Sequence, residues 1–217
     1  MIEICLSVNL SRHGSVFNVD QISIDMNKIW KYLNVSNHQE ISDELYQYAT
    51  SQTDLLIDPD KLNNLHWQHV PSIMIHCPKL REFLNNQYLM PVKMGFIVIH
   101  TKKYVPTHAD HVDHYVRLLW PVKNCAGSET KFYNLKKSQG QLIGAEYEGW
   151  YISYPTDHGG DVIDQFELTG PIVLDTSVPH SIHPDKILDD IRISFTIAFD
   201  PTLAISKSVN AWFDFAH

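Results

Sequence analysis

A short stretch of the chain, PTHADHVDHY at residues 106–115, gathers three histidines and two aspartates. The pattern His-x-Asp occurs in it twice, as His108-Ala109-Asp110 and as His111-Val112-Asp113. In an extended chain, residues two positions apart point to the same face, so the two pairs would face opposite sides. One metal ion can therefore use one pair only, and its third ligand must come from elsewhere in the chain.

The best candidate for that ligand is His180, in VLDTSVPHSIHP at residues 173–184. It follows an apolar strand and a proline, where a strand end can aim a side chain into the mouth of a barrel. His183 is the close alternative. Two histidines and one carboxylate leave three metal positions open, which suits non-haem Fe(II) that binds an organic co-substrate and dioxygen together. A single histidine near a strand end is more often an exposed turn residue, so only the combination favours a metal site.

The stretch IRISFTIAF at residues 191–199 has two different faces. Its odd positions are all apolar and are expected to pack against helices or the other sheet's cover. Its even positions carry Arg192, Ser194 and Thr196, which would look into the barrel. A buried guanidinium is costly unless an anion meets it, and it forks well onto a carboxylate. An ordinary surface arginine on a half-exposed strand is the alternative.

The elements that position these residues are mostly strands. Runs rich in β-branched and aromatic residues predict strands at 94–104, 116–122, 130–135, 141–154, 170–175 and 192–200. Short strands separated by turns, with 155–165 as a connecting loop, indicate an antiparallel sandwich or barrel. We therefore expect a single domain over 1–217. It would have a jelly-roll core at 94–200, a mixed, largely helical part at 1–93 and a tail at 201–217.

Helices are expected in the N-terminal part. Apolar residues from Ile22 to Leu33 fit one helix face ending near Asn34. Ser36 and Gln39 have the spacing of a capping box at the start of a second helix. Pro78 suits the start of a third.

Composition narrows the functional classes. The chain has 217 residues and a net charge of −8, which argues against a broad phosphate-binding surface and a nucleic-acid partner. Three widely spaced cysteines give no disulfide framework and no cysteine-based zinc site. The polar N-terminus does not resemble a signal peptide, and no apolar run approaches the ~20 residues of a membrane helix. We expect a cytoplasmic protein without a membrane partner, and the oligomeric state stays open.

Together, His108-Ala109-Asp110, His180 and Arg192-Ile193-Ser194 resemble the motif of the Fe(II)- and 2-oxoglutarate-dependent dioxygenases, over roughly residues 94–200. HADHVDHYVRLLWPVKN with TKFY looks most like the aspartyl/asparaginyl β-hydroxylase and free-proline hydroxylase branch. In that branch an arginine about nine residues after the first ligand helps hold the C1 carboxylate end of 2-oxoglutarate. Arg117 lies at that distance (117 − 108 = 9). This spacing favours His108 and Asp110 over His111 and Asp113, and Asp110 brings the chain closer to the proline hydroxylases.

The resemblance implies a double-stranded β-helix of the cupin kind. Fe(II) would be held by His108, Asp110 and His180, and 2-oxoglutarate by Arg117, Arg192 and Ser194, with dioxygen as the second co-substrate. The reaction would hydroxylate an amino acid or peptide side chain and release succinate. Four aromatic residues could line the cavity, although aromatic residues on strands are more often core: Trp120, Tyr133, Trp150 and Tyr151. Two alternatives remain, a cupin-like metal enzyme that does not use 2-oxoglutarate and a non-catalytic β-sandwich binding module.

Overall fold

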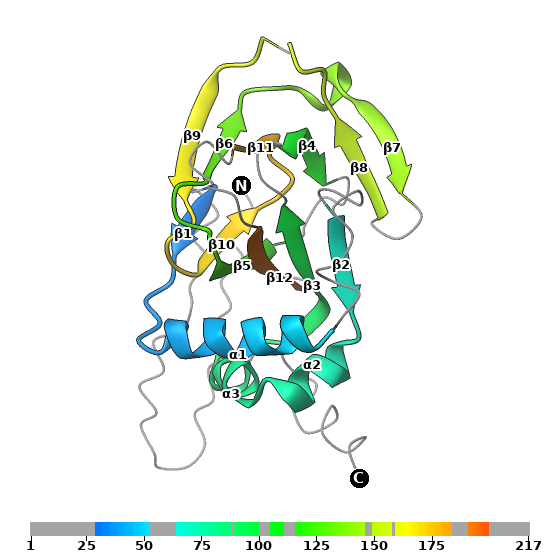
Figure 1. The fold of residues 1–217 in the computed structure, drawn as a ribbon. Coiled ribbons are helices and arrows are strands. Elements are labelled where there is room, and N and C mark those ends of the chain that lie inside the picture. The colour runs from blue at the N-terminus through cyan, green and yellow to red at the C-terminus, as the bar shows by residue number, and fades with distance from the viewer. Residues whose placement is uncertain are drawn as a thin grey trace, which may run out of the picture.

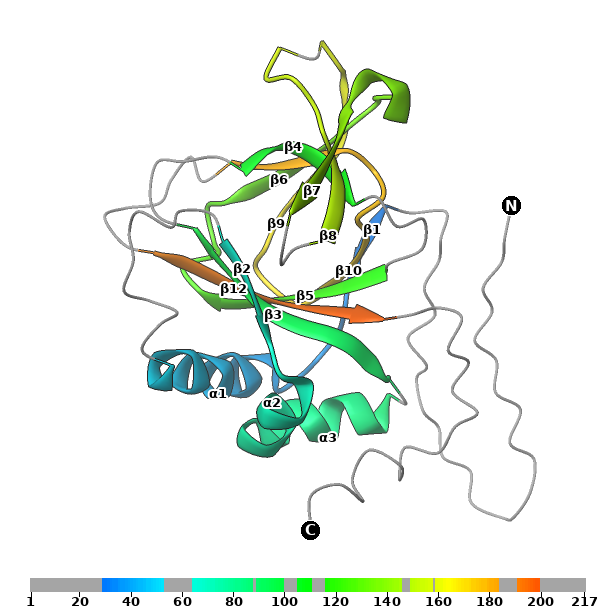
Figure 2. The ribbon, with the colours of Figure 1, turned by 90° about the vertical axis from the view of Figure 1, so that its right-hand side faces the viewer.

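The computed structural model describes residues 29–52, 64–87, 89–99, 105–110, 116–145, 149–157, 159–183 and 191–199. In these ranges the chain forms two six-stranded antiparallel sheets and three α-helices. The two sheets lie one above the other, and the helices cover the outer side of the lower sheet (Figures 1 and 2). The predicted fold class, mainly β with helices in a double-stranded β-helix, is confirmed.

The lower sheet, called the first sheet here, packs against the helices. Its strands, in spatial order, are β1 (Trp30–Tyr32), β10 (Ile172–Asp175), β5 (Val116–Lys123), β12 (Arg192–Phe199), β3 (Pro91–Ile99) and β2 (Asn64–Gln68). On the central strand β12, Ile193, Phe195 and Ile197 are fully buried in the main core cluster together with helix residues. The predicted alternation of this strand is therefore confirmed, and its apolar face meets the helices.

The upper sheet, called the second sheet, contains the His-x-Asp strand. Its strands, in spatial order, are β7 (Gln141–Ala145), β8 (Gly149–Ser153), β4 (Val105–Asp110), β11 (His180–His183), β6 (Glu129–Tyr133) and β9 (Val162–Glu167). A short 3-10 helix, Lys137–Gln139, precedes β7. Strands β4 and β11 are neighbours, so segments some seventy residues apart meet at the centre of this sheet (180 − 108 = 72).

The helices are α1 (His38–Ser51), α2 (Val70–His76) and α3 (Pro78–Asn86). In α1, Ile41, Leu45, Tyr48 and Ala49 recur at helical spacing and are buried against the first sheet. Pro78 occupies the first turn of α3, as predicted, because a helix start needs no backbone N–H there. Among the described residues, no helix is long and apolar enough to span a membrane.

Several predicted elements were wrong. Residues 30–32 form a strand rather than the end of a helix, because β1 pairs with β10 at the sheet edge; residues 22–28 lie outside the described ranges. The expected capping box is not formed: α1 begins at His38, and its N-cap Asn37 makes no side-chain cap bond. The run 141–154 is two paired strands, β7 and β8, rather than one. Strands β2, β9 and β11 were not predicted, nor was α2.

Candidate functional site

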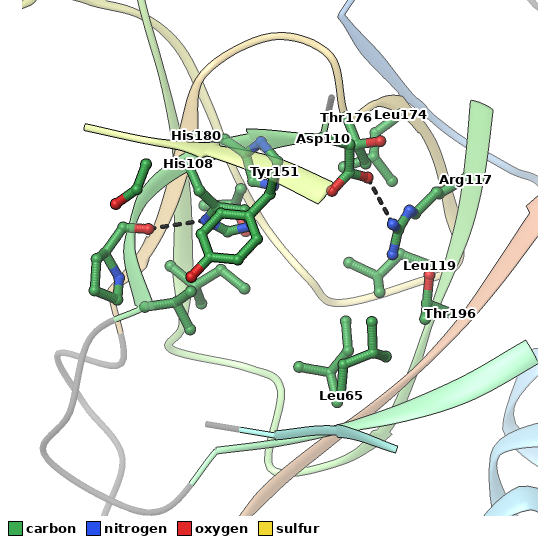
Figure 3. A pocket seen from close by; sticks show the side chains of 16 residues that line it. Leu65, His108, Asp110, Arg117, Leu119, Tyr151, Leu174, Thr176, His180 and Thr196 are labelled. Atoms are coloured by element: carbon green, nitrogen blue, oxygen red, sulfur yellow. Dashed lines mark hydrogen bonds and ion pairs between the residues drawn. The ribbon is translucent and has the colours of Figure 1, made fainter. Parts of the chain in front are cut away.

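A cavity of about 270 Å³ opens between the two sheets. Apolar and polar residues line it in about equal number, and they come from both walls (Figure 3). Its polar side chains include His108, Asp110 and His180 from the second sheet and Arg117 and Thr196 from the first. Polar groups that converge in an apolar cavity mark the default candidate for a binding or active site.

His108 and His180 face each other across the β4–β11 pair. They are register partners, and their ring centroids lie 4.4 Å apart. In each ring Nδ1 lies 2.8 Å from the carbonyl oxygen two residues earlier, that of Pro106 or of Val178. A carbonyl accepts only, so Nδ1 must carry the proton and Nε2 keeps its lone pair. Both imidazoles therefore have the tautomer that a metal-binding histidine needs.

The electrostatic surroundings keep His180 neutral. Burial, with a smaller effect of the neighbouring His108, lowers the pKa of His180 to about 3, although Asp110 acts in the opposite direction. A neutral imidazole is the form that can donate a lone pair to a metal.

Asp110 follows His108 on the same face of β4 and carries the nearest carboxylate. Its Oδ2 lies 2.6 Å from Nη2 of Arg117, on β5 of the opposite sheet (Figure 3). Burial alone raises the pKa of Asp110, but Arg117, a hydrogen bond from Thr176 and the two histidines together hold that pKa below its usual range. The carboxylate is therefore ionised and already paired.

The residues fit a metal, although no ligand cluster is preassembled. Within the described ranges, no three histidine, cysteine or acidic side chains surround one point closely enough to hold an ion. The ion pair with Arg117 explains this, because it draws the carboxylate toward the first sheet. Two imidazoles and one carboxylate nevertheless form the donor set of a facial triad, the choice for non-haem Fe(II).

Arg192 is the least satisfied charge in the described part of the chain. Its side chain is fully buried, and Nη1 donates to Ser194 Oγ at 3.1 Å. Among the described residues, no acceptor reaches its Nε or Nη2. Burial lowers the pKa of Arg192, but a guanidinium stays charged. Arg192 shares a face of β12 with Thr196, which lines the cavity, although Arg192 itself lies beyond the lining residues.

The predicted site residues thus fall on two walls. His108, Asp110 and His180 come from the second sheet, whereas Arg117, Arg192 and Ser194 come from the first. His183 lies on the other face of β11, 2.7 Å from Ser181 Oγ. His111, Asp113 and His114 lie outside the described residues.

Of the aromatic candidates, Tyr151 lines the cavity, with its ring edge-on to His108 at 6.2 Å. Trp120 lies instead in the helix-side core, where Nε1 lies 3.2 Å from Ser42 Oγ. Tyr133 bonds Ser181 on the outer face, and the side chain of Trp150 lies outside the description. Sequence reasoning missed Thr176, which hydrogen-bonds Asp110, and Thr130, which pairs with Ile182 of β11.

Comparisons with known proteins support the fold. No family model matches the chain, and no curated protein matches it in sequence. Among solved structures, SnoK, a non-heme alpha-ketoglutarate-dependent carbocyclase from nogalamycin biosynthesis, matches 80% of this chain and 80% of its own at 8% identity and TM-score 0.52. A prolyl-4-hydroxylase from Pseudomonas putida matches 80% and 93% at 12% identity and TM-score 0.43. AviO1 from Streptomyces viridochromogenes matches 78% and 87% at 13% identity and TM-score 0.44. At 8% identity, the likeness to SnoK shows the fold alone.

Proposed function

We propose that the chain is an Fe(II)- and 2-oxoglutarate-dependent oxygenase that hydroxylates an amino acid or peptide side chain. One observation carries the proposal: two imidazoles, each oriented by a hydrogen bond from Nδ1 to a backbone carbonyl, lie beside an ionised carboxylate in one cavity. The buried guanidinium of Arg192, whose Nε and Nη2 meet no acceptor among the described residues, supports it from the opposite wall.

Each residue has a defined task in this proposal. His108, Asp110 and His180 hold the iron. Bound iron supplies the chemistry by which 2-oxoglutarate, dioxygen and a substrate C–H bond give succinate, carbon dioxide and a C–OH group. Arg192 and Ser194 receive the C5 carboxylate of 2-oxoglutarate, which satisfies the donors that the apo protein leaves unused. The apolar lining keeps bulk water away from the reacting centre.

Arg117 has two anionic partners in this proposal, Asp110 and the C1 carboxylate of 2-oxoglutarate. In the structure it pairs with Asp110, and in this proposal it also helps to hold the C1 carboxylate end of 2-oxoglutarate. If Asp110 bound the iron instead, Arg117 would be available to that carboxylate. The cation would then exchange one anionic partner for another.

The two alternative functions differ at Arg192. A cupin-like metal enzyme without 2-oxoglutarate has no use for a fully buried cation with two free donors, and neither has a non-catalytic module. Burying such a charge without a partner is costly, so an incoming anion is the simplest account of it.

Anaerobic titration with Fe(II) and 2-oxoglutarate tests the proposal. We expect a weak visible charge-transfer band in the wild type, and succinate release when oxygen is admitted. The His108→Ala variant should show neither, whereas His183→Ala, which changes a histidine on the other face of the sheet, should show both. Absence of the band and of succinate in the wild type would refute the oxygenase proposal.

A further inference from the structure

Two cations lie in one cross-strand row of the first sheet. Lys93 on β3 and Arg117 on β5 are both register partners of Ala198 on β12. Directly paired residues share a face of the sheet, and Arg117 lines the cavity. Lys93 therefore stands on the cavity side as well, with only the small Ala198 between the two cations.

A tryptophan lies against both cations. Nζ of Lys93 is 5.3 Å, and Cζ of Arg117 is 5.5 Å, from the ring centroid of Trp67 on β2. Trp67 pairs with Gly95, and a Cβ at Gly95 would lie 3.0 Å from Trp67 Cε3 and 2.9 Å from the His66 carbonyl oxygen. The missing side chain thus leaves room for the indole to lie against β3, where it holds both cations by cation–π contact.

This cluster, defined here as Lys93, Trp67 and Arg117, has unused hydrogen-bond donors. Lys93 is exposed, and no carboxylate among the described residues pairs with it. Within the same ranges, no acceptor meets the buried Nε1 of Trp67 or the buried Nε of Arg117. Asp110 pairs with Arg117, and Lys93 has no such partner among the described residues, so the cluster is left with an excess positive charge.

The 2-oxoglutarate proposed above does not account for this charge. One carboxylate of 2-oxoglutarate is assigned to Arg192 and the other to the metal and Arg117. The ammonium group of Lys93 remains for a different molecule.

We propose that the Lys93–Trp67–Arg117 cluster binds a carboxylate of the primary substrate, and that this substrate is a small acid with an apolar body. The carboxylate would accept hydrogen bonds from Lys93 Nζ and Trp67 Nε1. The body would lie against Leu65, Ile97 and Leu119, which line the adjoining cavity. This inference rests on the proposed function for the identity of the substrate, but the acid-binding site itself does not.

Matched acids and amides test the inference directly. Phenylacetate is compared with phenylacetamide, and hexanoate with hexanamide, by ligand-observed NMR and calorimetry. The measurements use protein loaded anaerobically with Mn(II) and 2-oxoglutarate, and protein with neither. The wild type should bind each acid about tenfold or more tightly than its amide, as for a charged hydrogen bond.

Variants assign the preference to the cluster. Lys93→Met should abolish the preference for the acid, Lys93→Arg should keep most of it, and Trp67→Phe should weaken it. Lys31→Met, which removes an exposed lysine on the distant edge strand β1, serves as the matched control and should keep it. Arg192→Met should keep it too, because its guanidinium serves the other anion.

The outcomes separate the two proposals. Equal affinity for acids and amides overturns the inference, as does an acid preference that survives Lys93→Met or disappears in Arg192→Met. A preference that depends on Lys93 in protein that fails to bind Fe(II) and 2-oxoglutarate supports the acid site and refutes the oxygenase.

Discussion

Arg117 Nη2 lies 2.6 Å from Asp110 Oδ2, so the carboxylate closest to the two cavity histidines is already paired with a cation from the opposite sheet. Both side chains are mostly buried, at 15% and 17% exposure. A metal that binds Asp110 through Oδ2 must therefore displace Arg117. The ion pair stabilises the metal-free protein and competes with loading at the same time.

Replacing Arg117 by Met should separate these two effects. The metal-free variant should lose about 2–3 kcal/mol of unfolding free energy, because the buried Asp110 carboxylate loses its partner. Without 2-oxoglutarate, Mn(II) should then raise the melting temperature of the variant more than that of the wild type, since the metal replaces the lost cation. Thermal unfolding with and without Mn(II) measures both. An equal rise in the two proteins would show that the ion pair does not compete with the metal.

Replacing His180 by Ala should weaken Mn(II) binding by about a hundredfold or more, because one of two preoriented Nε2 lone pairs disappears. His183→Ala is the matched control. Its ring bonds Ser181 on the other side of β11, so metal affinity should stay within about twofold. Mn(II) electron paramagnetic resonance counts free ion directly. Reversed effects would make His183 the ligand, which was the alternative prediction from the sequence.

Replacing Arg192 by Met should have opposite effects on stability and binding. The metal-free protein should be as stable as the wild type or more stable, because a buried charge with two unpaired donors is removed. Affinity for 2-oxoglutarate should fall about a hundredfold, since the C5 carboxylate loses a bidentate partner. Urea unfolding and calorimetry report the two quantities. A large loss of stability with unchanged 2-oxoglutarate affinity would assign Arg192 a structural role.

Cys77 provides a pH test away from the site. Burial, with a smaller effect of Glu44, raises the pKa of the Cys77 thiol to about 12 from 9.0. The unfolded chain loses this proton above pH 9 while the folded one keeps it until about pH 12, so stability should fall as pH rises through that window. Cys77→Ala should make this decline shallower in urea unfolding at pH 8 to 10.5. Iodoacetamide should leave Cys77 of the folded protein unmodified at pH 9, as read by peptide mass spectrometry; rapid labelling would contradict its burial.

Gly95 should be intolerant of a side chain. A Cβ there would meet the His66 carbonyl oxygen and the Trp67 ring, so Gly95→Ala should cost about 1–3 kcal/mol and displace the indole. Gly170→Ala is the control, because its nearest non-neighbour atom, on Tyr32, would lie 3.7 Å away, an ordinary contact. Urea unfolding compares the free energies of unfolding of the two variants. Equal values would show that β2 moves to accommodate the new methyl group without a loss of stability.

The sequence predicted what local periodicity encodes. The alternation on β12 set its apolar face against the helices and Arg192 inside, and the jelly-roll class followed from the number of short strands. The His-x-Asp spacing placed His108 and Asp110 on one face of β4, as the cavity lining shows.

The elements and contacts that the sequence did not predict depend on pairing between distant segments. Residues 30–32 alternate too briefly to identify a strand, and they become one only by pairing with β10. Strand β11, which carries His180, was not predicted because it has only four residues and is stabilised by pairing with a strand on each side. The contact between Arg117 and Asp110 joins two sheets, so no local pattern contains it.

The division of the cavity between two walls has a consequence for how such a protein can change over time. The proposed metal ligands stand on the second sheet, and the cations that select anions stand on the first. On the proposed acid site, substitutions at Lys93 or Trp67 would alter which acid fits without touching a histidine. New specificities can therefore arise on one sheet while the reactive centre on the other is inherited unchanged.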